Sequence, residues 1–150
     1  MPRFYCPIPL STGMTVQLAE SIVRHLQVLR LTEGEPITLF NGAGGEYAAT
    51  LTGLDKKRAH ATVGVFSPRE AELPFALTLA QALPEASKMD WIVEKAVELG
   101  VAVIQPLATQ RSVVKLVGDR VEKRQAHWGG IIVAASEQCG RNRLAQLAPL

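Results

Sequence analysis

The sequence predicts an α/β protein in which a β-rich N-terminal unit precedes a parallel α/β unit. Short segments with alternating apolar residues fill the first 66 residues, whereas apolar runs and helical stripes alternate after residue 75. A charged stretch with two prolines at 67–74 separates the two patterns and is typical of a linker. The length of 150 residues allows one domain or two small ones.

Residues 1–70 are expected to form a small β-barrel. In segments 46–52 and 58–66, apolar and polar residues alternate, so each strand would bury one face. The Asn-Gly-Ala-Gly-Gly run at 41–45 predicts a hairpin turn, not a phosphate-binding loop, because a strand follows it where a dinucleotide site needs a helix. The other predicted elements are strands at 3–6, 14–18 and 36–40 and a helix at 19–29.

Residues 75–150 alternate between strand and helix, which predicts parallel strands with right-handed crossovers. The apolar run at 76–83 is typical of a strand buried on both faces. The further elements expected are a helix capped by Ser87 and ended by Gly100, a strand at 101–107, a long helix opened by an Asp119–Glu122 capping box, and a strand at 144–150. Such a unit has a thin core, so we expect the natural chain to continue past Leu150.

Composition excludes several classes of protein. The 16 basic and 14 acidic residues give a net charge of +2, which excludes a histone-like polycation. Two cysteines are too few for a disulfide framework, and no histidine–cysteine spacing predicts a metal site. No apolar run approaches the roughly 20 residues that span a bilayer, so we expect a soluble, cytoplasmic protein without membrane contact.

Two segments of the second unit are candidates for chemistry. Residues 111–150 carry seven basic and three acidic residues, which fits either a polyanion partner or a solvated helix face. Arg111 follows the second parallel strand, at the edge of an α/β sheet where ligands bind, although a surface ion pair explains it equally well. Segment 137–143 gathers polar residues after the long helix, where the helix dipole alone also favours Arg141 and Arg143. We expect Arg111 and Arg141 to share a cleft.

Six stretches, taken together and in order, resemble one family. They are Arg-Phe-Tyr at 3–5, His-Leu-Gln-Val-Leu-Arg at 25–30, Leu-Phe-Asn-Gly at 39–42, Lys-Met-Asp through Glu-Leu-Gly-Val at 88–101, Gln-Arg-Ser-Val-Val-Lys at 110–115, and Glu-Gln-Cys-Gly-Arg-Asn-Arg at 137–143. In this order the chain resembles the small-subunit ribosomal RNA methyltransferase E family, the 16S rRNA uridine N3-methyltransferases.

The resemblance implies a PUA-like RNA-binding barrel over 1–70 and the first half of a SPOUT methyltransferase domain, a trefoil-knot α/β fold, over 75–150. It also implies S-adenosylmethionine as cofactor without a metal, 16S rRNA or the small ribosomal subunit as partner, and a homodimer. The family's Gly-Pro-Glu-Gly-Gly loop and knotted segment have no counterpart here, and Leu144-Ala145 replaces a common Val-Pro step. The cofactor site is therefore expected outside 1–150, and this chain is expected to be inactive alone.

The family motifs also suggest site residues. Arg111 and Arg141 are predicted to stabilise charge on the deprotonated uridine or to position phosphate, and Glu137 to orient the base or accept its proton. The predicted RNA contacts are Arg3, Arg24, His25, Arg30, Lys56, Lys57, Arg58, Lys115 and Arg143.

Two other functions remain open from the sequence. The chain as given would serve as a non-catalytic RNA-binding module if it cannot bind the methyl donor. A small-molecule α/β enzyme with an accessory barrel is the other alternative, but it lacks a nucleotide-binding loop and leaves the basic C-terminal stretch unexplained.

Overall fold

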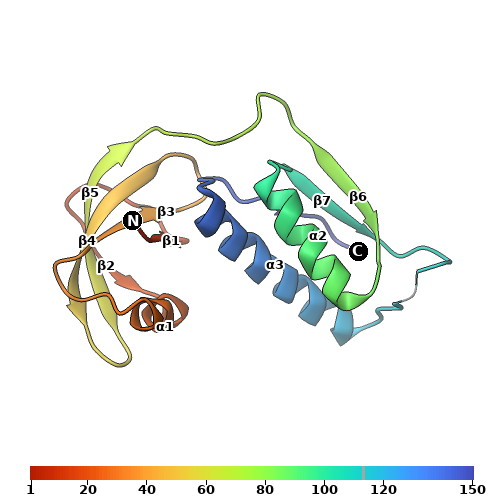
Figure 1. Cartoon of the computed structure of the whole chain (residues 1–150), viewed down its shortest axis with the longest axis horizontal. Coiled ribbons are helices and arrows are strands. Elements are labelled where there is room, and N and C mark those ends of the chain that lie inside the picture. The colour runs from red at the N-terminus through yellow and green to blue at the C-terminus, as the bar shows by residue number, and fades with distance from the viewer. Residues whose placement is uncertain (113) are drawn as a thin grey trace. The chain divides into compact units, whose positions relative to one another are not determined.

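The computed structural model describes residues 1–112 and 114–150 and contains two compact units, Met1–Glu70 and Ala71–Leu150 (Figure 1). Each unit has its own cluster of buried hydrophobic side chains. Val113, which belongs to the Gln-Arg-Ser-Val-Val-Lys stretch at 110–115, lies outside the described residues.

The first unit is a curled five-stranded sheet with one helix. Its strand order is β1-β3-β4-β5-β2, in which β1 and β3 are parallel and all other neighbours are antiparallel. The predicted small barrel is therefore present as a half-barrel whose edges are β1 and β2. Its elements are β1 (Arg3–Tyr5), β2 (Thr15–Leu18), α1 (Glu20–Val28), β3 (Pro36–Phe40), β4 (Glu46–Leu54) and β5 (Ala59–Ser67).

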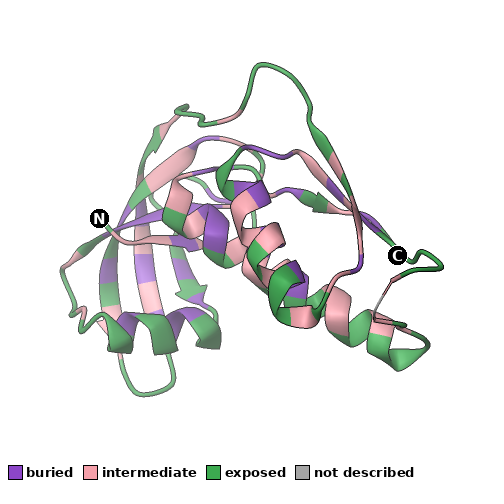
Figure 2. Ribbon diagram, turned by 45° about the vertical axis from the view of Figure 1, so that its right-hand side comes forward, coloured by how far each residue is buried: buried purple, intermediate pink, exposed green. Residues whose placement is uncertain are grey.

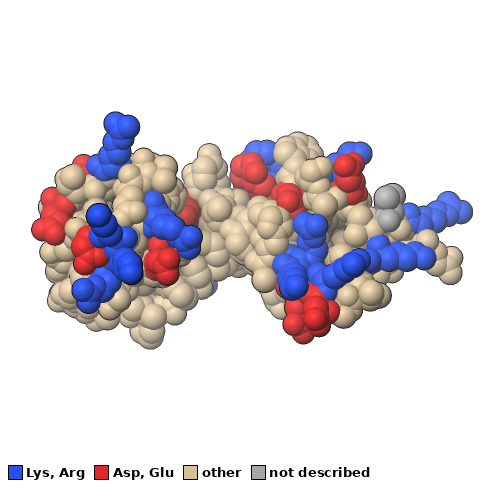
Figure 3. Space-filling view, turned by 90° about the horizontal axis from the view of Figure 1, so that it is seen from below, with Lys and Arg blue, Asp and Glu red and all other residues tan. Residues whose placement is uncertain are grey.

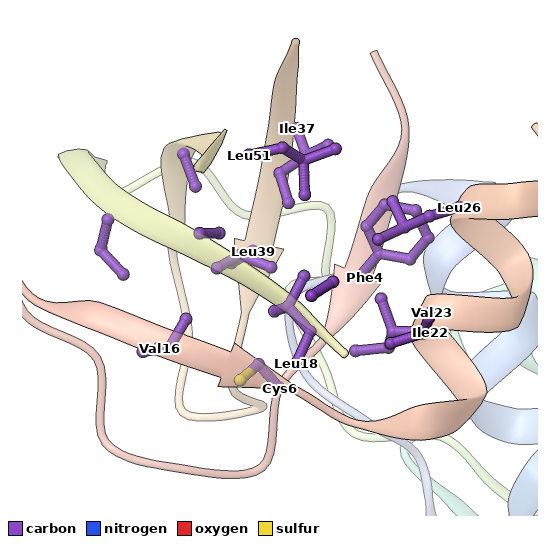
Figure 4. Close-up of a cluster of buried hydrophobic side chains, with 14 of the residues drawn as sticks. Phe4, Cys6, Val16, Leu18, Ile22, Val23, Leu26, Ile37, Leu39 and Leu51 are labelled. Carbon is purple, nitrogen blue, oxygen red and sulfur yellow. The ribbon is translucent and has the colours of Figure 1, made fainter. Parts of the chain in front are cut away.

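The core of the first unit lies between the curled sheet and α1. Figure 4 shows Phe4 of β1 and Leu39 of β3 pointing toward the apolar side chains of α1. Phe4, Leu26 and Leu39 are fully buried, and burial of one such side chain stabilises the fold by about 1.5–3 kcal/mol. The helical stripe predicted at 19–29 is confirmed, because Ile22, Val23 and Leu26 are its buried residues.

A β-bulge in β5 changes the predicted alternation. Ala61 and Val63 are buried as expected, but Val65 is 73% exposed. The register shifts by one residue between the pairs Ala49–Val63 and Tyr47–Phe66, so β5 carries an extra residue there. A bulge turns the following side chains to the other face, which explains why Val65 points to solvent.

The glycine-rich segment at 41–45 is a turn that leads into β4, as the sequence predicts. Gly42, Gly44 and Gly45 all have positive φ, a backbone conformation that residues with a Cβ rarely adopt. A Cβ at Gly45 would collide with the ring of Phe66. The Gly45 N–H donates to the Glu70 carboxylate at 2.8 Å, so this backbone donor is already used within the chain.

The second unit is a three-stranded parallel sheet with order β6-β7-β8 and two helices. Both crossovers move in the same direction across the sheet, so right-handed connections place both helices on the same face; Figure 1 shows α2 and α3 side by side in front of the strands. The elements are β6 (Thr78–Ala82), α2 (Ala86–Glu98), β7 (Val103–Leu107), α3 (Asp119–Cys139) and β8 (Gln146–Leu147).

The prediction that segment 76–83 is buried on both faces is wrong. In β6, Leu79 packs against the core beneath the helices, whereas Thr78 and Ala80 are exposed. The reason is that α2 and α3 cover only one face and β6 is an edge strand of the described sheet. The helix stripe is predicted correctly, because Met89 and Val93 of α2 are buried.

The two predicted helix caps are also wrong. α2 begins at Ala86 after Glu85, and α3 begins at Asp119 after Gly118, with no side-chain cap hydrogen bond at either end. Asp119 instead occupies the first turn of α3, where a carboxylate interacts favourably with the helix dipole. The predicted stop at Gly100 is confirmed, because this residue has φ of 90° directly after the last turn of α2.

An ionic cluster connects the first residue of β4 to two neighbouring segments of the first unit. The Glu46 carboxylate accepts hydrogen bonds from Arg69 Nε at 2.9 Å and Arg69 Nη2 at 2.8 Å, and it also pairs with Arg3 of β1. These bonds, led by those from Arg69 and followed by those from Arg3, lower the pKa of Glu46 from 4.5 to about 2 despite its partial burial.

We expect Glu46→Gln to lower the stability of the first unit at neutral pH by about 1 kcal/mol, the order expected of a partly exposed ion pair. Because the pKa of Glu46 is lower in the folded state, its stabilisation is complete above about pH 4.5 and is lost as the pH falls toward about 2. Urea unfolding across this pH range measures the effect. The variant should lose part of the acid dependence, whereas Glu20→Gln, in the first turn of α1, should keep it; equal pH profiles of both variants and the parent would contradict the assignment.

Candidate nucleic-acid interface

Basic side chains of the first unit gather on α1 and on the tip of the β4–β5 hairpin. Arg24, His25 and Arg30 are exposed on or directly after α1, and Lys56, Lys57 and Arg58 are exposed at the tip. Gln27 of α1 joins the two segments, because its Nε2 donates to the Lys56 carbonyl at 3.2 Å. We call Arg24, Arg30, Lys56, Lys57 and Arg58 the α1–hairpin surface; Figure 3 shows several Lys and Arg side chains on the visible face of this unit, with Asp and Glu side chains among them.

The hairpin tip is held in shape by Asp55. Its Oδ1 accepts the backbone N–H groups of Lys57 and Arg58, both at 2.7 Å. These two bonds are the main reason that the pKa of Asp55 is lowered, so the carboxylate stays ionised. The ordered tip presents Lys56 and Lys57 to solvent without an ion pair among the described residues.

Arg30 has an unusual backbone conformation for an arginine. Its φ is 57°, the left-handed conformation that commonly ends a helix and is usually occupied by glycine. Its N–H still donates to the Gln27 carbonyl at 3.0 Å. The turn therefore requires the left-handed backbone conformation at position 30, but it does not require an arginine side chain there.

Two of the predicted RNA contacts, Arg3 and His25, make contacts with other side chains of the first unit. Arg3 is largely buried, with 13% of its side chain exposed, pairs with Glu46 and lies 5.0 Å from the centre of the Phe40 ring. His25 lies on the exposed side of α1, but its ring contacts Phe4 edge-on at 5.4 Å. Arg3 thus holds β1 to β4, and we leave it out of the α1–hairpin surface.

Arg141 is a buried clamp of the second unit. It is 3% exposed; its Nε and Nη2 donate to the two carboxylate oxygens of Glu72 at 3.0 and 2.6 Å. Its Nη1 donates to the carbonyls of Val97 and Val101 at 3.1 and 2.9 Å. Arg141 therefore connects the segment after α3 to the first residues of the unit and to the end of α2.

The prediction that Arg111 and Arg141 share a cleft is wrong. Arg141 binds backbone that directly precedes β7, whereas Arg111 follows the end of β7. Five strand residues span about 16 Å, so the two arginines lie at opposite ends of the strands: Arg141 at the amino edge of the sheet and Arg111 at its carboxyl edge. The parallel pairing explains this, because each crossover returns the chain from the carboxyl end of one strand to the amino end of the next.

The other predicted site residues of the second unit lie at one or the other of these two ends of the strands. Arg111 and Lys115 are exposed in the loop after β7, where the Thr109 hydroxyl lies 2.9 Å from that of Ser112 and closes a local turn. Glu137 is half-buried in the last turn of α3, and Arg143 is exposed just beyond, both on the edge occupied by Arg141.

A set of cations at the start of α3 contributes to the basic excess of residues 111–150, but none of them is among the predicted site residues. Arg120, Lys123 and Arg124, with His127, line a surface hollow. Their spacing of three and four residues, which places side chains on one helix face, is the signal that identifies them in the sequence.

The described residues form neither a cluster of metal-ligand side chains nor a helix that could span a membrane. Outside Val113, no group of three or more His, Cys, Asp or Glu side chains is placed to hold a metal ion. Within the same residues, no helix is both long and apolar enough to span a membrane. Cys139 is partly buried against the second core, as a small hydrophobic residue would be.

Comparison with known proteins gives the same two-part division. A family model described as an RNA methyltransferase PUA domain matches residues 18–64, and one described as an RNA methyltransferase domain matches residues 71–150. The ribosomal RNA small subunit methyltransferase E of Bacillus subtilis is 31% identical over 98% of this chain, and that of Synechocystis is 35% identical over 89%. The crystal structure of the corresponding Neisseria gonorrhoeae protein, bound to S-adenosyl methionine, is 46% identical over 99% of this chain, with a TM-score of 0.96.

The fold and these matches define a PUA-type unit followed by an RNA methyltransferase domain. The chain belongs to the RNA methyltransferase family that includes the ribosomal RNA small subunit methyltransferases E. It spans 59% of the length of the Bacillus subtilis relative and 62% of the Neisseria gonorrhoeae chain.

We expect Glu72→Ala to destabilise the second unit by about 2 kcal/mol, between the values for exposed and fully buried ion pairs. The change removes the carboxylate to which Nε and Nη2 of the buried Arg141 guanidinium donate. Urea unfolding measures the loss. Glu85→Ala is the control, because its pair with Lys88 is exposed on both sides; equally small losses for both variants would contradict the clamp.

We expect Arg30→Gly to fold at least as stably as the parent, because glycine adopts the left-handed conformation without steric cost. The variant should nevertheless bind single-stranded RNA less tightly, with the slope of log affinity against log salt reduced by about 0.7 for one lost phosphate contact. Fluorescence anisotropy at several salt concentrations measures the slope. Arg30→Lys, which keeps the charge, should retain it; an unchanged slope in Arg30→Gly removes Arg30 from the α1–hairpin surface.

Proposed function

We propose that this chain supplies the RNA-binding unit and the first part of the catalytic domain of an S-adenosylmethionine-dependent methyltransferase that modifies uridine N3 in 16S rRNA. The observation that carries the proposal is the match of one chain to both an RNA methyltransferase PUA domain and an RNA methyltransferase domain. The substrate would be 16S rRNA or the small ribosomal subunit, in the cytoplasm where ribosomes are assembled.

The α1–hairpin surface is proposed to hold the RNA backbone. Its cations are exposed, and Arg58 is the one member paired with a carboxylate among the described residues. Such a surface binds phosphates without reading sequence, so it contributes affinity and a strong salt dependence. The target uridine has to be unstacked before its N3 is accessible, at a cost of a few kcal/mol.

Arg111 is proposed to act on the target base. Methylation at N3 requires loss of the imide proton, which leaves negative charge on the uracil ring and its carbonyl oxygens. A guanidinium placed beside a carbonyl stabilises that charge as it develops. Arg111 fits this role because it is exposed at the carboxyl edge of a parallel sheet, and Lys115 in the same loop is proposed to contact the neighbouring phosphate.

Glu137, the proposed base or orienting group, lies at the other edge of the sheet. A single copy of the chain cannot bring Glu137 and Arg111 to one uridine, because β7 separates the two edges. We therefore propose a homodimer in which one copy supplies Arg111 and the other supplies Glu137. Arg143 would contact RNA from the Glu137 edge, and Arg141 would position this segment through its bonds to Glu72.

The methyl donor is proposed to bind residues outside 1–150. The loops at the carboxyl edge of the described sheet are residues 83–85 after β6 and the segment from 108 to 118 after β7. The longer one contains a single glycine, Gly118, which precedes α3. S-adenosylmethionine supplies the methyl group when bound; the residues described here are proposed to bind and orient RNA.

The experiment is methylation of 16S rRNA by the complete natural protein with labelled S-adenosylmethionine, followed by reverse transcription. A methyl group on N3 blocks the pairing edge of uridine, so we expect the transcript to stop at one uridine. Arg111→Ala should reduce the single-turnover rate by roughly 10²–10³-fold, the usual loss for one group that stabilises developing charge, while Lys88→Gln should react at the parental rate. Methylation of another base, or a normal rate in Arg111→Ala, contradicts the proposal.

Calorimetry of the 150-residue chain with S-adenosylmethionine separates this proposal from its alternatives. We expect no heat from this chain and binding by the complete protein. An RNA-binding module without catalysis would bind RNA but show no methylation in either form. A small-molecule enzyme would bind a free nucleotide and ignore ribosomal RNA.

A further inference from the structure

A second basic surface lies on α3, in the unit that carries the RNA methyltransferase domain. Arg120, Lys123, Arg124 and His127 follow one another at intervals of three and four residues, so they form one stripe along the helix. We call these four residues the α3 basic face. Figure 3 shows Lys and Arg side chains, with acidic side chains beside them, over this part of the second unit, and Figure 2 shows the first turns of α3 to be largely exposed.

The stripe borders a hollow in the surface. The four residues of the α3 basic face and Leu116 enclose a volume of about 250 Å³. This volume is smaller than the roughly 300–1,000 Å³ of a small-molecule site, and four of its five lining residues are basic. The hollow therefore suits one phosphodiester group of a longer strand better than an entire free ligand.

Arg120, Lys123 and Arg124 have no direct ion pair among the described residues, although Asp119 and Glu122 lie in the first turn of the same helix. Among residues 1–112 and 114–150, no carboxylate lies within 4.0 Å of Arg120, Lys123 or Arg124. Lys95 on α2 provides the contrast, because its ammonium lies 2.8 Å from Glu94 and 2.9 Å from Glu98. Arg120, Lys123 and Arg124 are thus the members of the α3 basic face that are available to an external anion.

Helix stability does not explain these cations. Like charges at intervals of three and four residues repel one another, and positive side chains in the first turns of a helix oppose its dipole. The acidic group that faces the stripe from α2 is Asp90, whose Oδ2 lies 2.8 Å from His127 Nε2. An anionic partner would relieve the remaining repulsion.

The surface also extends toward the proposed site of chemistry. Leu116 lines the hollow, Lys115 precedes it in the chain, and Arg111 lies exposed in the same loop. A nucleic-acid strand seated in the hollow would therefore lie against Leu116, in the loop whose earlier part holds Arg111. Phosphate contacts of this kind fix the position of a strand without reading its bases.

We propose that the α3 basic face binds the RNA backbone adjacent to the target nucleotide and so guides it to Arg111. This inference rests on the proposed function, since it takes the partner to be RNA. The face adds a phosphate-binding site in the second unit to the α1–hairpin surface of the first.

The test uses the 150-residue chain and a fluorescein-labelled single-stranded RNA of mixed sequence, with binding measured at several salt concentrations. The double variant Arg120→Gln and Lys123→Gln should bind about tenfold more weakly at low salt, and its slope of log affinity against log salt should fall by about 0.7 for each lost contact. The control is Lys88→Gln with Lys95→Gln, which removes the same net charge from α2, where both lysines are paired with glutamates.

The control should retain the parental slope. Circular dichroism and urea unfolding should show the α3 variant to be folded, because it removes two mutually repelling charges. An unchanged slope in that variant overturns the inference, as does an equal fall in the control or a failure of the parent chain to bind RNA.

This test is independent of the methylation assay. If the complete protein methylates 16S rRNA but the α3 variant binds RNA with the parental slope, this inference fails and the proposed function stands. If the α3 variant loses affinity and slope but the complete protein modifies no uridine, the surface is supported and the proposed chemistry is wrong.

Discussion

The right-handed crossovers of the second unit determine which of its charged residues are available to a partner. Because both crossovers run in the same direction, α2 and α3 cover one face of the sheet and the loops divide between its two edges. Segments before β7 and β8 meet at one edge, where Arg141 is buried against Glu72 and two backbone carbonyls. The loop after β7 carries Arg111 at the other edge.

Burial separates the basic residues of this chain into two groups with different physical roles. Arg3 and Arg141 are enclosed and bonded to carboxylates, so they hold segments together and their charge is cancelled locally. The α1–hairpin surface and the α3 basic face are exposed or partly exposed and are largely without carboxylate partners among the described residues. A net charge of only +2 therefore conceals two local surfaces that suit a polyanion.

Most elements were predictable from the sequence because their signals are local, but the site was less so. Alternating strands, the stripe of α1 and the stop at Gly100 depend on neighbouring residues, and the structure has them close to the predicted positions. The exposed face of β6 and the outward side chain of Val65 depend on sheet order and on a bulge, which no local pattern specifies. Likewise, the separation of Arg111 from Arg141 follows from the path of the whole βαβ unit. The family motifs that contain these two residues give their positions in the sequence but not the distance between them.

The central claim is that exposed cations bind RNA while buried ones maintain the fold. The most direct measurement is side-chain NMR of the arginine Nε–Hε groups during titration of the chain with single-stranded RNA. Signals of Arg24, Arg30, Arg111, Arg120 and Arg124 should shift, and those of Arg3 and Arg141 should stay in place. Shifts confined to Arg3 and Arg141, or equal shifts of all arginines, would contradict the account.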